Sequence, residues 1–512
     1  MIQIKEYSGH IRNWRQLCQD LSIEAGLSRE EREAQILIKG YEKWGSDMAD
    51  HMHGMFAFAL WIEEENKLFC LRDQFGAKPF YYYVTESGEI LCSGSIRKII
   101  ENSSFKKELN EEILQIYLSL TYVAGENTFF KGLKKLMPGC HLTWQNGKTS
   151  IVRYWKPEFK PDNSKTLDMW ADEIHETVKL MMDEIKTDDE TAHSFLSGGV
   201  DSSYVLAMSD VQMTNSCGYE EERFDESRLA KETADLLGRD HSTCIINPKD
   251  YFDIVPYVMY NMEQPLGDAS AIAFALGCIA TAKSTKLCYS GEGADEFFGG
   301  YNMYRNAERY GENLKTFYVG NTNIMKEDEK KKILKNYNED ILPINLVKHI
   351  YEETEGLDPL TKMSAVDIQV WLDGDIYLNV DKMSTAAGLE IRMPLTDRRI
   401  FNIASRLPSE YKVNEEQNKV AFRTAASKVL PDSIAFRKKL GFIVPIRIWL
   451  ADSNYNGDVV RLFNSDIAEK FFNMDEIHAI FDEYINGNSD NWRKVWTIYT
   501  FLVWYEEYFV KR

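Results

Sequence analysis

The stretch SFLSGGVDSSYV, residues 194–205, restricts the possible folds more than any other part of the chain. A short apolar run enters it and the helix-like run SYVLAMSDV leaves it, which predicts a strand, a tight loop and a helix. The adjacent glycines Gly198 and Gly199 let backbone N–H groups approach an anion, and the helix N-terminus adds partial positive charge. Further donors are the hydroxyls of Ser197, Ser202 and Ser203. These features predict a phosphate-binding loop; the alternative is a glycine-rich turn without a ligand.

An acidic residue inside that loop points to a metal ion. Asp201 would repel a phosphate unless a cation lay between them, and Mg²⁺ suits that position. A second glycine-containing loop, YSGEGADEFFGGY at 289–301, follows the apolar run TKLCY and carries Asp295. Since loops at the carboxyl ends of parallel strands meet at one crevice, Asp201 and Asp295 are predicted to share Mg²⁺. The alternative for the second loop is an ordinary acidic helix N-terminus.

The apolar pattern divides the chain into two parts. Residues 1–157 contain three hairpin patterns, the clearest around Asn146 and its following glycine, and are predicted to be β-rich. A polar, proline-containing loop after Trp155 marks the boundary. In residues 165–512 short apolar runs first alternate with helical ones, and the part from about Lys331 is helical. This order predicts an α/β domain with a parallel sheet and a helical C-terminal part.

Composition limits the classes of partner. The 512 residues carry a formal net charge of −20, which argues against coating nucleic acid or binding an anionic membrane. Eight scattered cysteines without a CxxC pair fit a reducing cytoplasm rather than a zinc site or a disulfide framework. The first ten residues have no apolar secretory segment, and the most apolar run, from Ala271, is too short to span a bilayer. We therefore expect a cytoplasmic protein.

Several ordered motifs resemble the asparagine synthetase family. In the second part they are SGGVDSS, FDES, QPLGDASAI, SGEGADE, VDKMSTAAGLEIRMPLTD and RKKLGFIVPIRIWL. In the first part GMFAFALW, LRDQFGAKPFYYY, CSGSIRK, LMPGC and RYWKP are similar to that family's glutaminase domain. The resemblance implies a truncated N-terminal-nucleophile (Ntn) type domain followed by a doubly wound ATP-pyrophosphatase (PP-loop) domain. β-Lactam synthetases and lasso-peptide cyclases are related to the same family.

The resemblance also implies roles for individual residues. Members of the family adenylate a carboxylate with ATP, release pyrophosphate, and let an amine displace AMP to leave an amide. The residues that would hold the pyrophosphate are Ser197, Gly198, Gly199, Asp201 and Ser202. Those that would lie along the adenosine are Leu196, Ser290 and Gly291. Asp201 and Asp295 would bind Mg²⁺.

Two further positions match catalytic residues of the family. Lys439, in RKKLGF, matches a lysine that neutralises charge on the α-phosphate and the tetrahedral intermediate, as a fixed cation can. Glu292 matches the glutamate that contacts the substrate amino acid, a position that resembles tyrosine in β-lactam-forming relatives. Glu292 therefore favours an aspartate-like substrate. Asp268, in PLGDAS, either faces the same pocket or forms a turn.

The glutaminase pattern of the family is incomplete in this chain. That domain begins with a cysteine directly after the initiator Met, which acts as nucleophile with its own amine as base, whereas residue 2 here is Ile. The stretch from Tyr7 lines up with the family's NGEIYNYREL, so the chain starts later than its relatives, and Ser8 replaces the Asn of that element. The glutamine-binding SD-x-E reads Arg32-Glu33-Ala34-Gln35. We expect a degenerate domain that does not hydrolyse glutamine and is kept as a scaffold.

The expected function is that of an AMP- and pyrophosphate-forming carbon–nitrogen ligase that uses ATP and Mg²⁺, and a homodimer is expected. One interpretation is an asparagine synthetase that uses free ammonia or ammonia from a separate subunit. Another is a specialised amide ligase, such as a lasso-peptide cyclase or a β-lactam-synthetase-like enzyme, in which a peptide or small molecule supplies the amine. An inactive regulatory subunit is the third, and the intact Asp201, Asp295, Glu292 and Lys439 argue against it.

Overall fold

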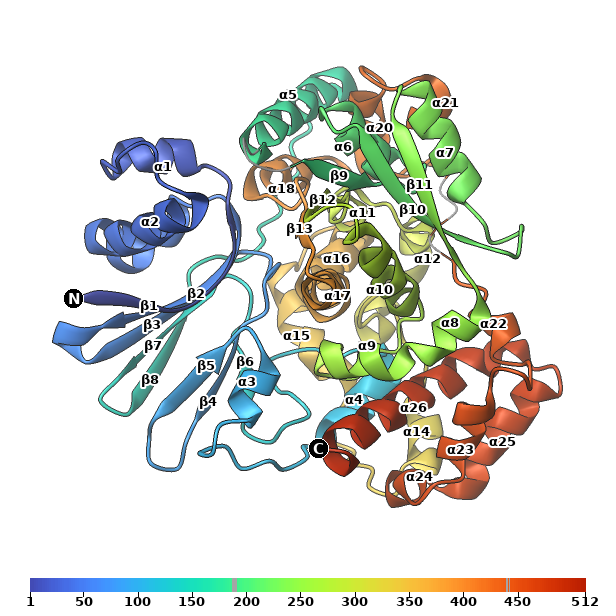
Figure 1. Cartoon of the computed structure of the whole chain (residues 1–512). Helices are drawn as coiled ribbons and strands as arrows, with labels where there is room; N and C mark the ends of the chain where they lie inside the picture. The colour runs from blue at the N-terminus through green and yellow to red at the C-terminus, as the bar shows by residue number, and fades with distance from the viewer. Residues whose placement is uncertain (187–190, 439–440, 442) are drawn as a thin grey trace.

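The computed structural model describes residues 1–186, 191–438, 441 and 443–512. Figure 1 shows antiparallel sheets from the N-terminal third lying beside a parallel sheet that is surrounded by helices. No helix in this described part is both long and apolar enough to cross a membrane. The predicted α/β class, with a β-rich N-terminal part, a parallel sheet and a helical C-terminal part, is confirmed.

The N-terminal part contains two antiparallel sheets, and the three predicted hairpins form. The larger sheet has the order β1-β2-β3-β7-β8, and the smaller has the order β5-β4-β6. Asn146 and Gly147, between β7 and β8, have φ values of 51° and 78°, as a two-residue hairpin turn requires. The strands are β1 (Ile2–Ile11), β2 (Gly54–Ile62), β3 (Lys67–Arg72), β4 (Tyr81–Val84), β5 (Ile90–Ser93), β6 (Lys134–Lys135), β7 (Cys140–Gln145) and β8 (Lys148–Arg153).

The second sheet is parallel and has the order β11-β10-β9-β12-β13. Chain order therefore runs outward from β9 in one direction to β11 and in the other to β13. The point of reversal lies between β9 and β12, and a ligand crevice is expected there. The strands are β9 (Ala192–Phe195), β10 (Met213–Tyr219), β11 (Asp240–Ile246), β12 (Leu287–Tyr289) and β13 (Glu390–Arg392).

Helices cover the parallel sheet and form the C-terminal part. Helix α5 shows why such segments fold: Thr166 caps its N-terminus, and a stripe from Trp170 to Ile185 is buried. The helices up to the second loop of interest are α1 (Trp14–Asp20), α2 (Arg29–Trp44), α3 (Ile96–Ile100), α4 (Glu112–Leu120), α5 (Leu167–Ile185), α6 (Val200–Ala207), α7 (Ser227–Leu236), α8 (Pro248–Asp253), α9 (Val255–Met262), α10 (Ser270–Thr281) and α11 (Ala294–Phe298). The later ones are α12 (Ala307–Tyr310), α13 (Leu314–Phe317), α14 (Glu327–Ile333), α15 (Pro343–Glu353), α16 (Pro359–Val366), α17 (Tyr377–Ala387), α18 (Arg398–Ala404), α19 (Ser409–Lys412), α20 (Val420–Ala426), α21 (Asp432–Ala435), α22 (Ile446–Trp449), α23 (Gly457–Phe463), α24 (Asp466–Phe471), α25 (Met474–Ile485) and α26 (Trp492–Tyr505).

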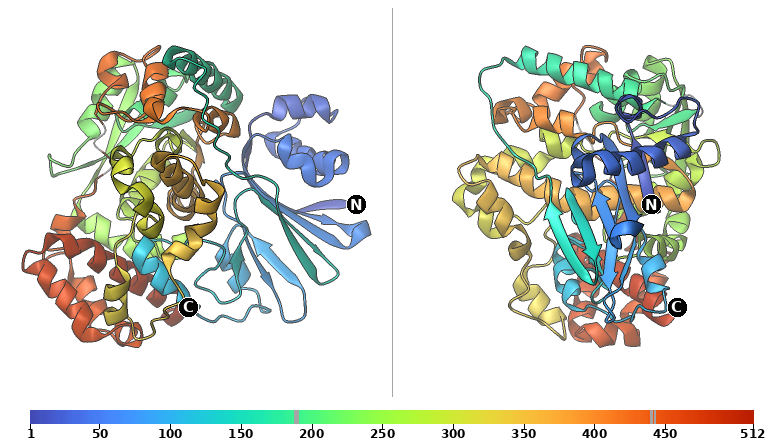
Figure 2. Two further views of the ribbon diagram at one scale, coloured as in Figure 1. Left: turned by 180° about the vertical axis from the view of Figure 1, so that it is seen from behind. Right: turned by 90° about the vertical axis from the view of Figure 1, so that its left-hand side faces the viewer.

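The two parts are joined by more than a linker. Helix α4 belongs to the N-terminal third, yet Tyr117 on it is fully buried and hydrogen-bonds Thr500 of α26 at 2.7 Å. After β8 the chain runs along the second part to α5, as Figure 2 shows. In this linker the N–H groups of Lys160 and Asp162 donate to the carbonyls of Ser405 and Arg406. The N-terminal part is therefore attached to the second part at α4 as well as along the linker.

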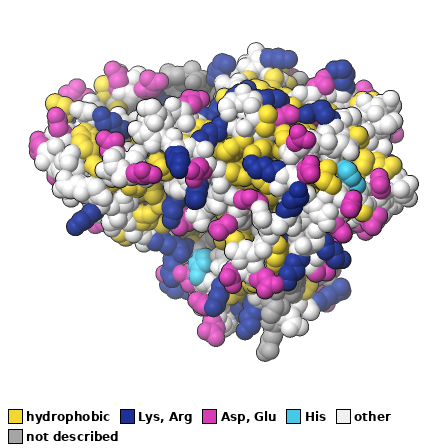
Figure 3. Space-filling model, turned by 90° about the horizontal axis from the view of Figure 1, so that it is seen from below, with side chains coloured by type: hydrophobic (Ala, Val, Ile, Leu, Met, Phe, Trp, Pro, Cys, Tyr) yellow, Lys and Arg dark blue, Asp and Glu magenta, His cyan; other side chains and the backbone are white. Residues whose placement is uncertain are grey.

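Charged side chains are mixed on the surface. On the face shown in Figure 3, lysines and arginines lie among aspartates and glutamates. Ion pairs also form locally on the surface, such as those of Arg461 with Asp458 and Glu506. Positive and negative side chains are therefore interspersed on this face.

The π-helical segment Asp367–Ile376, between α16 and α17, places a carboxyl group in the core. Asp367 is fully buried, and the hydroxyls of Tyr304 and Tyr318 donate to its Oδ2, each at 2.6 Å. Burial raises the pKa of Asp367 to about 7, although the two tyrosine hydrogen bonds oppose the shift. The carboxyl group therefore keeps its proton over a range of pH in which the unfolded chain has lost it.

This pKa shift makes stability depend on pH in a defined direction. Between about pH 4 and 7 unfolding releases a proton from Asp367, so the free energy of unfolding falls as pH rises. Below about pH 4 the carboxyl group is protonated in both states, and this loss of stability is absent. Asp367→Asn removes this contribution, so the stability of wild type relative to the variant should fall by about 1 kcal/mol per pH unit in that window. Urea unfolding at several pH values measures it, and a constant difference would contradict the assignment.

Candidate functional site

One cavity collects the predicted binding residues. It has a volume of about 280 Å³ and lies at the carboxyl ends of β9, β10 and β12. Its lining includes Leu196, Ser197, Gly198, Gly199, Asp201, Ser202, Ser290, Gly291, Glu292 and Asp295. The position is the predicted crevice where strand order reverses. The structure thus brings together the predicted residues of two loops that are far apart in the sequence.

The β9–α6 loop is compact for identifiable reasons. Gly198 has a φ of 75°, and a Cβ there would lie 2.8 Å from the carbonyl carbon of Leu229. The Ser197 N–H donates to the hydroxyl of Ser202 at 3.1 Å, and the Gly199 N–H donates to the hydroxyl of Ser197 at 3.3 Å. The loop is therefore tied to itself and pressed against α7, which requires glycine at 198.

The β12–α11 loop lies against the first loop. A Cβ at Gly291 would be 2.8 Å from the backbone nitrogen of Ser202 and 2.9 Å from the carbonyl carbon of Asp201. Only a residue without a side chain allows this approach. Glu292 follows, lines the cavity, and accepts a hydrogen bond from the hydroxyl of Ser290 at 3.4 Å. The two loops therefore form one continuous wall.

The two predicted metal-binding carboxylates converge on a single cation. The ammonium group of Lys419 lies 2.5 Å from Oδ2 of Asp201 and 2.8 Å from Oδ1 of Asp295. The Lys419 side chain is 2% exposed, whereas each aspartate is about one-fifth exposed. Lys419 also has a φ of 59°, in the left-handed region that most residues avoid. The aspartates thus lie close enough together to bind one positive charge jointly.

This donor set fits Mg²⁺. Two carboxylates from different loops point at the same place, and Oδ1 of Asp201 is buried without a hydrogen-bond partner among the described residues. A Cβ at Gly300 would lie only 1.8 Å from Oδ1 of Asp295, so glycine at 300 keeps that carboxylate accessible. Mg²⁺ is commonly bound by one or two carboxylates together with substrate phosphates. Asp201 and Asp295 are therefore suitable ligands for it.

Neighbouring charges affect the same site. Burial and the negative charge of Asp295 raise the pKa of Glu296 to about 8, and the hydroxyl of Tyr301 donates to this carboxyl group. Arg423 lines the cavity, and its guanidinium donates to the carbonyls of Asn418 and Ala435. Burial therefore favours the neutral form of Glu296, while Arg423 adds a positive charge to the cavity.

Arg437, the first residue of the basic run 437–439, contacts the first loop. Arg437 donates to the carbonyl of Gly198 at 3.0 Å and to the hydroxyl of Thr233 at 3.0 Å. Arg437 and Lys438 line the cavity. Lys439, the predicted catalytic lysine, lies outside the described residues. Its role therefore stays a prediction.

Asp268 forms a turn, which was one of the two roles predicted for it. Its carboxylate accepts hydrogen bonds from the backbone N–H of Ser270 at 2.9 Å and from the hydroxyl of Ser270 at 2.6 Å. Such contacts form a turn before α10. Within the described part of the chain, Asp268 is not among the residues that line the cavity.

Family models match both parts of the chain. An asparagine synthase model matches residues 171–506, and a glutamine amidotransferase domain model matches residues 4–155. The chain belongs to the asparagine synthase family. This membership places it among amide-synthesising ligases.

Two relatives cover nearly the whole chain, and a third covers about half of it. "Asparagine synthetase [glutamine-hydrolyzing] 1" of Bacillus subtilis is 31% identical over 99% of this chain and 86% of its own length. A putative asparagine synthetase [glutamine-hydrolyzing] of Mycobacterium tuberculosis is 28% identical over 98% of this chain and 83% of its own length. "Amidase chry2" of Gibberella zeae is 29% identical over 53% of this chain and 44% of its own length.

Arg32 and Glu33 stand where the glutamine-binding motif of the family is expected, and both make internal contacts, as does Asn13 in the stretch from Tyr7. Glu33 is buried and accepts a hydrogen bond from the Ile11 N–H at 3.1 Å. The guanidinium of Arg32 lies over the Trp14 ring, 3.7 Å from its centroid. The side chain of Asn13 donates to the carbonyl of His51 and accepts from the N–H of His53. These side chains hold β1, α2 and the turn before β2 together.

Sequence reasoning missed Lys419 and Arg423. They stand four residues apart in NKVAFR at the start of α20, a segment without glycine or a run of acids. The i,i+4 spacing of two basic residues in an otherwise apolar helix was a weak signal that they share a face. It did not indicate which carboxylates they would meet.

Proposed function

We propose that the protein is an ATP-dependent amide synthetase that forms AMP and pyrophosphate from an aspartate-like carboxylate. A carboxylate oxygen of the substrate attacks the α-phosphorus of ATP and pyrophosphate leaves. An amine then attacks the acyl carbon, loses a proton, and AMP leaves with the former carboxylate oxygen. The observation that carries this proposal is that Asp201 and Asp295 both contact the ammonium group of Lys419 beside a glycine loop.

The residues that line the cavity would have different roles in the reaction. The backbone N–H groups around Gly198 and Gly199 and the hydroxyls of Ser197 and Ser202 would bind the β- and γ-phosphates, which leave as pyrophosphate. Lys419 would help to stabilise negative charge on these phosphates, with Arg423 as a second cation. Mg²⁺, held by Asp201 and Asp295, would neutralise phosphate charge when bound. Leu196, Ser290 and Gly291 would lie along the adenosine, Lys439 would act at the α-phosphate, and Glu292 would contact the carboxylate substrate.

We further propose that this chain supplies no ammonia from glutamine. The support comes from the amidotransferase part, in which Glu33, Arg32 and Asn13 are engaged in internal contacts. The amine would then be free ammonia, ammonia from a separate subunit, or the amine of a peptide or small molecule. A homodimer and a cytoplasmic location stay predictions.

Product analysis tests the proposal directly. With aspartate and ammonium, ATP labelled at the α-phosphate should yield labelled AMP, and pyrophosphate should appear in equal amount, because the attack is on the α-phosphorus. Formation of ADP and inorganic phosphate would refute the mechanism. Glutamine in place of ammonium should give no amide above background; a rate equal to that with ammonium would contradict the absence of glutaminase activity. No pyrophosphate release with any free amino acid, but release with an acidic peptide, would select the specialised ligase.

A further inference from the structure

A buried arginine from the N-terminal part contacts the backbone of the second part. Arg12 follows β1, and its backbone N–H donates to the carbonyl of His53 at 2.7 Å. Its guanidinium donates to the carbonyl of Pro394 at 2.8 Å and to that of Thr396 at 2.7 Å. The same group lies 3.3 Å from the carboxylate of Asp397, and both side chains are 1% exposed. One side chain thus binds three groups of a single short segment.

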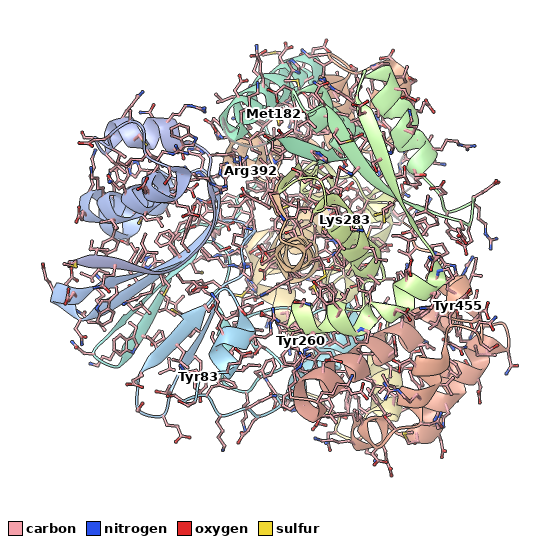
Figure 4. All side chains as sticks on the ribbon, viewed as in Figure 1. Tyr83, Met182, Tyr260, Lys283, Arg392 and Tyr455 are labelled. Carbon is pink, nitrogen blue, oxygen red and sulfur yellow. The ribbon has the colours of Figure 1, made fainter. Side chains whose placement is uncertain are left out.

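That segment runs from β13 to α18 along the side of the parallel sheet that faces the N-terminal part. Arg392, at the end of β13, marks the region in Figure 4. The segment has no strand or helix of its own between residues 393 and 397, so its carbonyl groups need other partners. Arg12 supplies two of the hydrogen bonds that these groups require.

The segment in turn contacts the loop that carries Glu292. The hydroxyl of Thr396 donates to the backbone carbonyl of Glu292 at 3.3 Å and shares a hydrogen bond with the hydroxyl of Tyr377 at 2.9 Å. Gly293 has a φ of 97°, and a Cβ there would lie 2.9 Å from the Tyr377 hydroxyl and 3.0 Å from that of Thr396. The backbone of residues 292 and 293 therefore rests on Thr396 and Tyr377.

We propose that Arg12 is a positioning residue, which sets the place of Glu292 in the cavity through residues 394–396. The inference rests on the proposed function for the identity of the substrate, but the contacts are independent of it. A planar guanidinium can donate to two carbonyls at once in a fixed geometry, whereas a lysine ammonium cannot reproduce that fork. The N-terminal part then contributes to the synthetase reaction without touching the substrate.

The charge of Asp397 keeps this arrangement intact. Burial opposes ionisation of Asp397, yet Arg12 and Arg399 hold the pKa of its carboxyl group well below the ordinary value. Arg399 donates to both oxygens of Asp397 and also pairs with Glu184 of α5. Arg12 therefore acts within a buried network that ties α5, α18 and β1 together.

The test compares Arg12→Met and Arg12→Lys with Lys78→Met in the full-length protein. Lys78 is a matched control, because its ammonium group makes a largely buried ion pair with Asp381 across the same interface, 2.8 Å long. Arg12→Met should raise KM for the carboxylate and lower kcat, together by about 10- to 100-fold in kcat/KM, with the affinity for ATP unchanged within about twofold. Arg12→Lys should have a thermal midpoint closer to that of wild type than Arg12→Met has. Its KM for the carboxylate should nevertheless stay close to that of Arg12→Met. Lys78→Met should lower the midpoint and leave KM unchanged.

A second measurement does not depend on the reaction. Hydrogen exchange of the amides in residues 290–297, without any substrate, should be faster in both Arg12 variants than in wild type and unchanged in Lys78→Met. If wild type shows no carboxylate-dependent pyrophosphate release, the proposed function fails and exchange alone decides the inference. If the exchange rates of all variants match wild type, or KM is unchanged in an active Arg12→Met, Arg12 only holds the two parts together and the inference is wrong.

Discussion

Replacing Asp201 or Asp295 with Asn should lower the rate of pyrophosphate release by about 10³-fold or more at millimolar Mg²⁺. Each substitution removes one of the two carboxylates that lie within 2.8 Å of the Lys419 ammonium group. One remaining carboxylate would bind Mg²⁺ too weakly to hold it between the protein and the phosphates. The rate is measured over a Mg²⁺ titration, and binding of Mn²⁺ in place of Mg²⁺ is followed by electron paramagnetic resonance.

The matched control for this pair is Asp210→Asn. Asp210 is exposed beyond the far end of α6, the helix that carries Asp201. This variant should keep wild-type activity and Mn²⁺ affinity. Melting curves should show that the three variants are folded. Full activity of both site variants would overturn the metal assignment, and so would unchanged Mn²⁺ affinity in folded but inactive proteins.

Replacing Lys419 with Met should lower the metal-free thermal midpoint by roughly 5–10 °C. The substitution leaves two carboxylates facing each other without the cation that now lies between them. Like charges at such a distance raise the pKa of one carboxyl group and oppose folding. Mg²⁺ should therefore raise the midpoint of the variant more than that of wild type. The rate of pyrophosphate release should fall by about 100-fold, because a buried cation is lost from the phosphate side of the cavity.

Lys428→Met is the control for this prediction. Lys428 lies just after the same helix, α20, but is about one-third exposed and pairs with Asp172 on the surface. Its removal should change the midpoint and the rate little, because an exposed ion pair contributes little to stability. A Lys419→Met protein with a wild-type midpoint in EDTA would show that Lys419 does not stabilise the aspartate pair.

Those parts of the candidate site that depend on the backbone conformation of a short segment could be predicted from the sequence. Gly198 and Gly291 are required by contacts of 2.8 Å that exclude any side chain, and such requirements leave glycine-rich motifs in the sequence. Asp201 and Asp295 follow these glycines at short fixed distances, so their loops were predictable too. Lys419 was not predictable, because its partners are 218 and 124 positions away and no local pattern encodes the meeting.

The parallel sheet, too, could be predicted only in part from the sequence. Apolar runs alternating with helical runs predicted strands and helices in order, and β9 to β12 were found where those runs lie. β13, with three residues, has no period of its own to detect, and only its pairing with β12 identifies it as a strand. The position of α4, buried against α26, was likewise not encoded by its own sequence.

By itself, the sequence determined the class of fold, the two phosphate-type loops and the aspartate pair, because glycine conformation, strand and helix periods and side-chain charge act over a few residues. The tertiary structure alone decided which groups from distant segments meet: Lys419 between the aspartates, and Arg12 on the carbonyls of Pro394 and Thr396. Those meetings depend on how the two parts pack, and packing is set by the summed burial of many side chains rather than by any one motif.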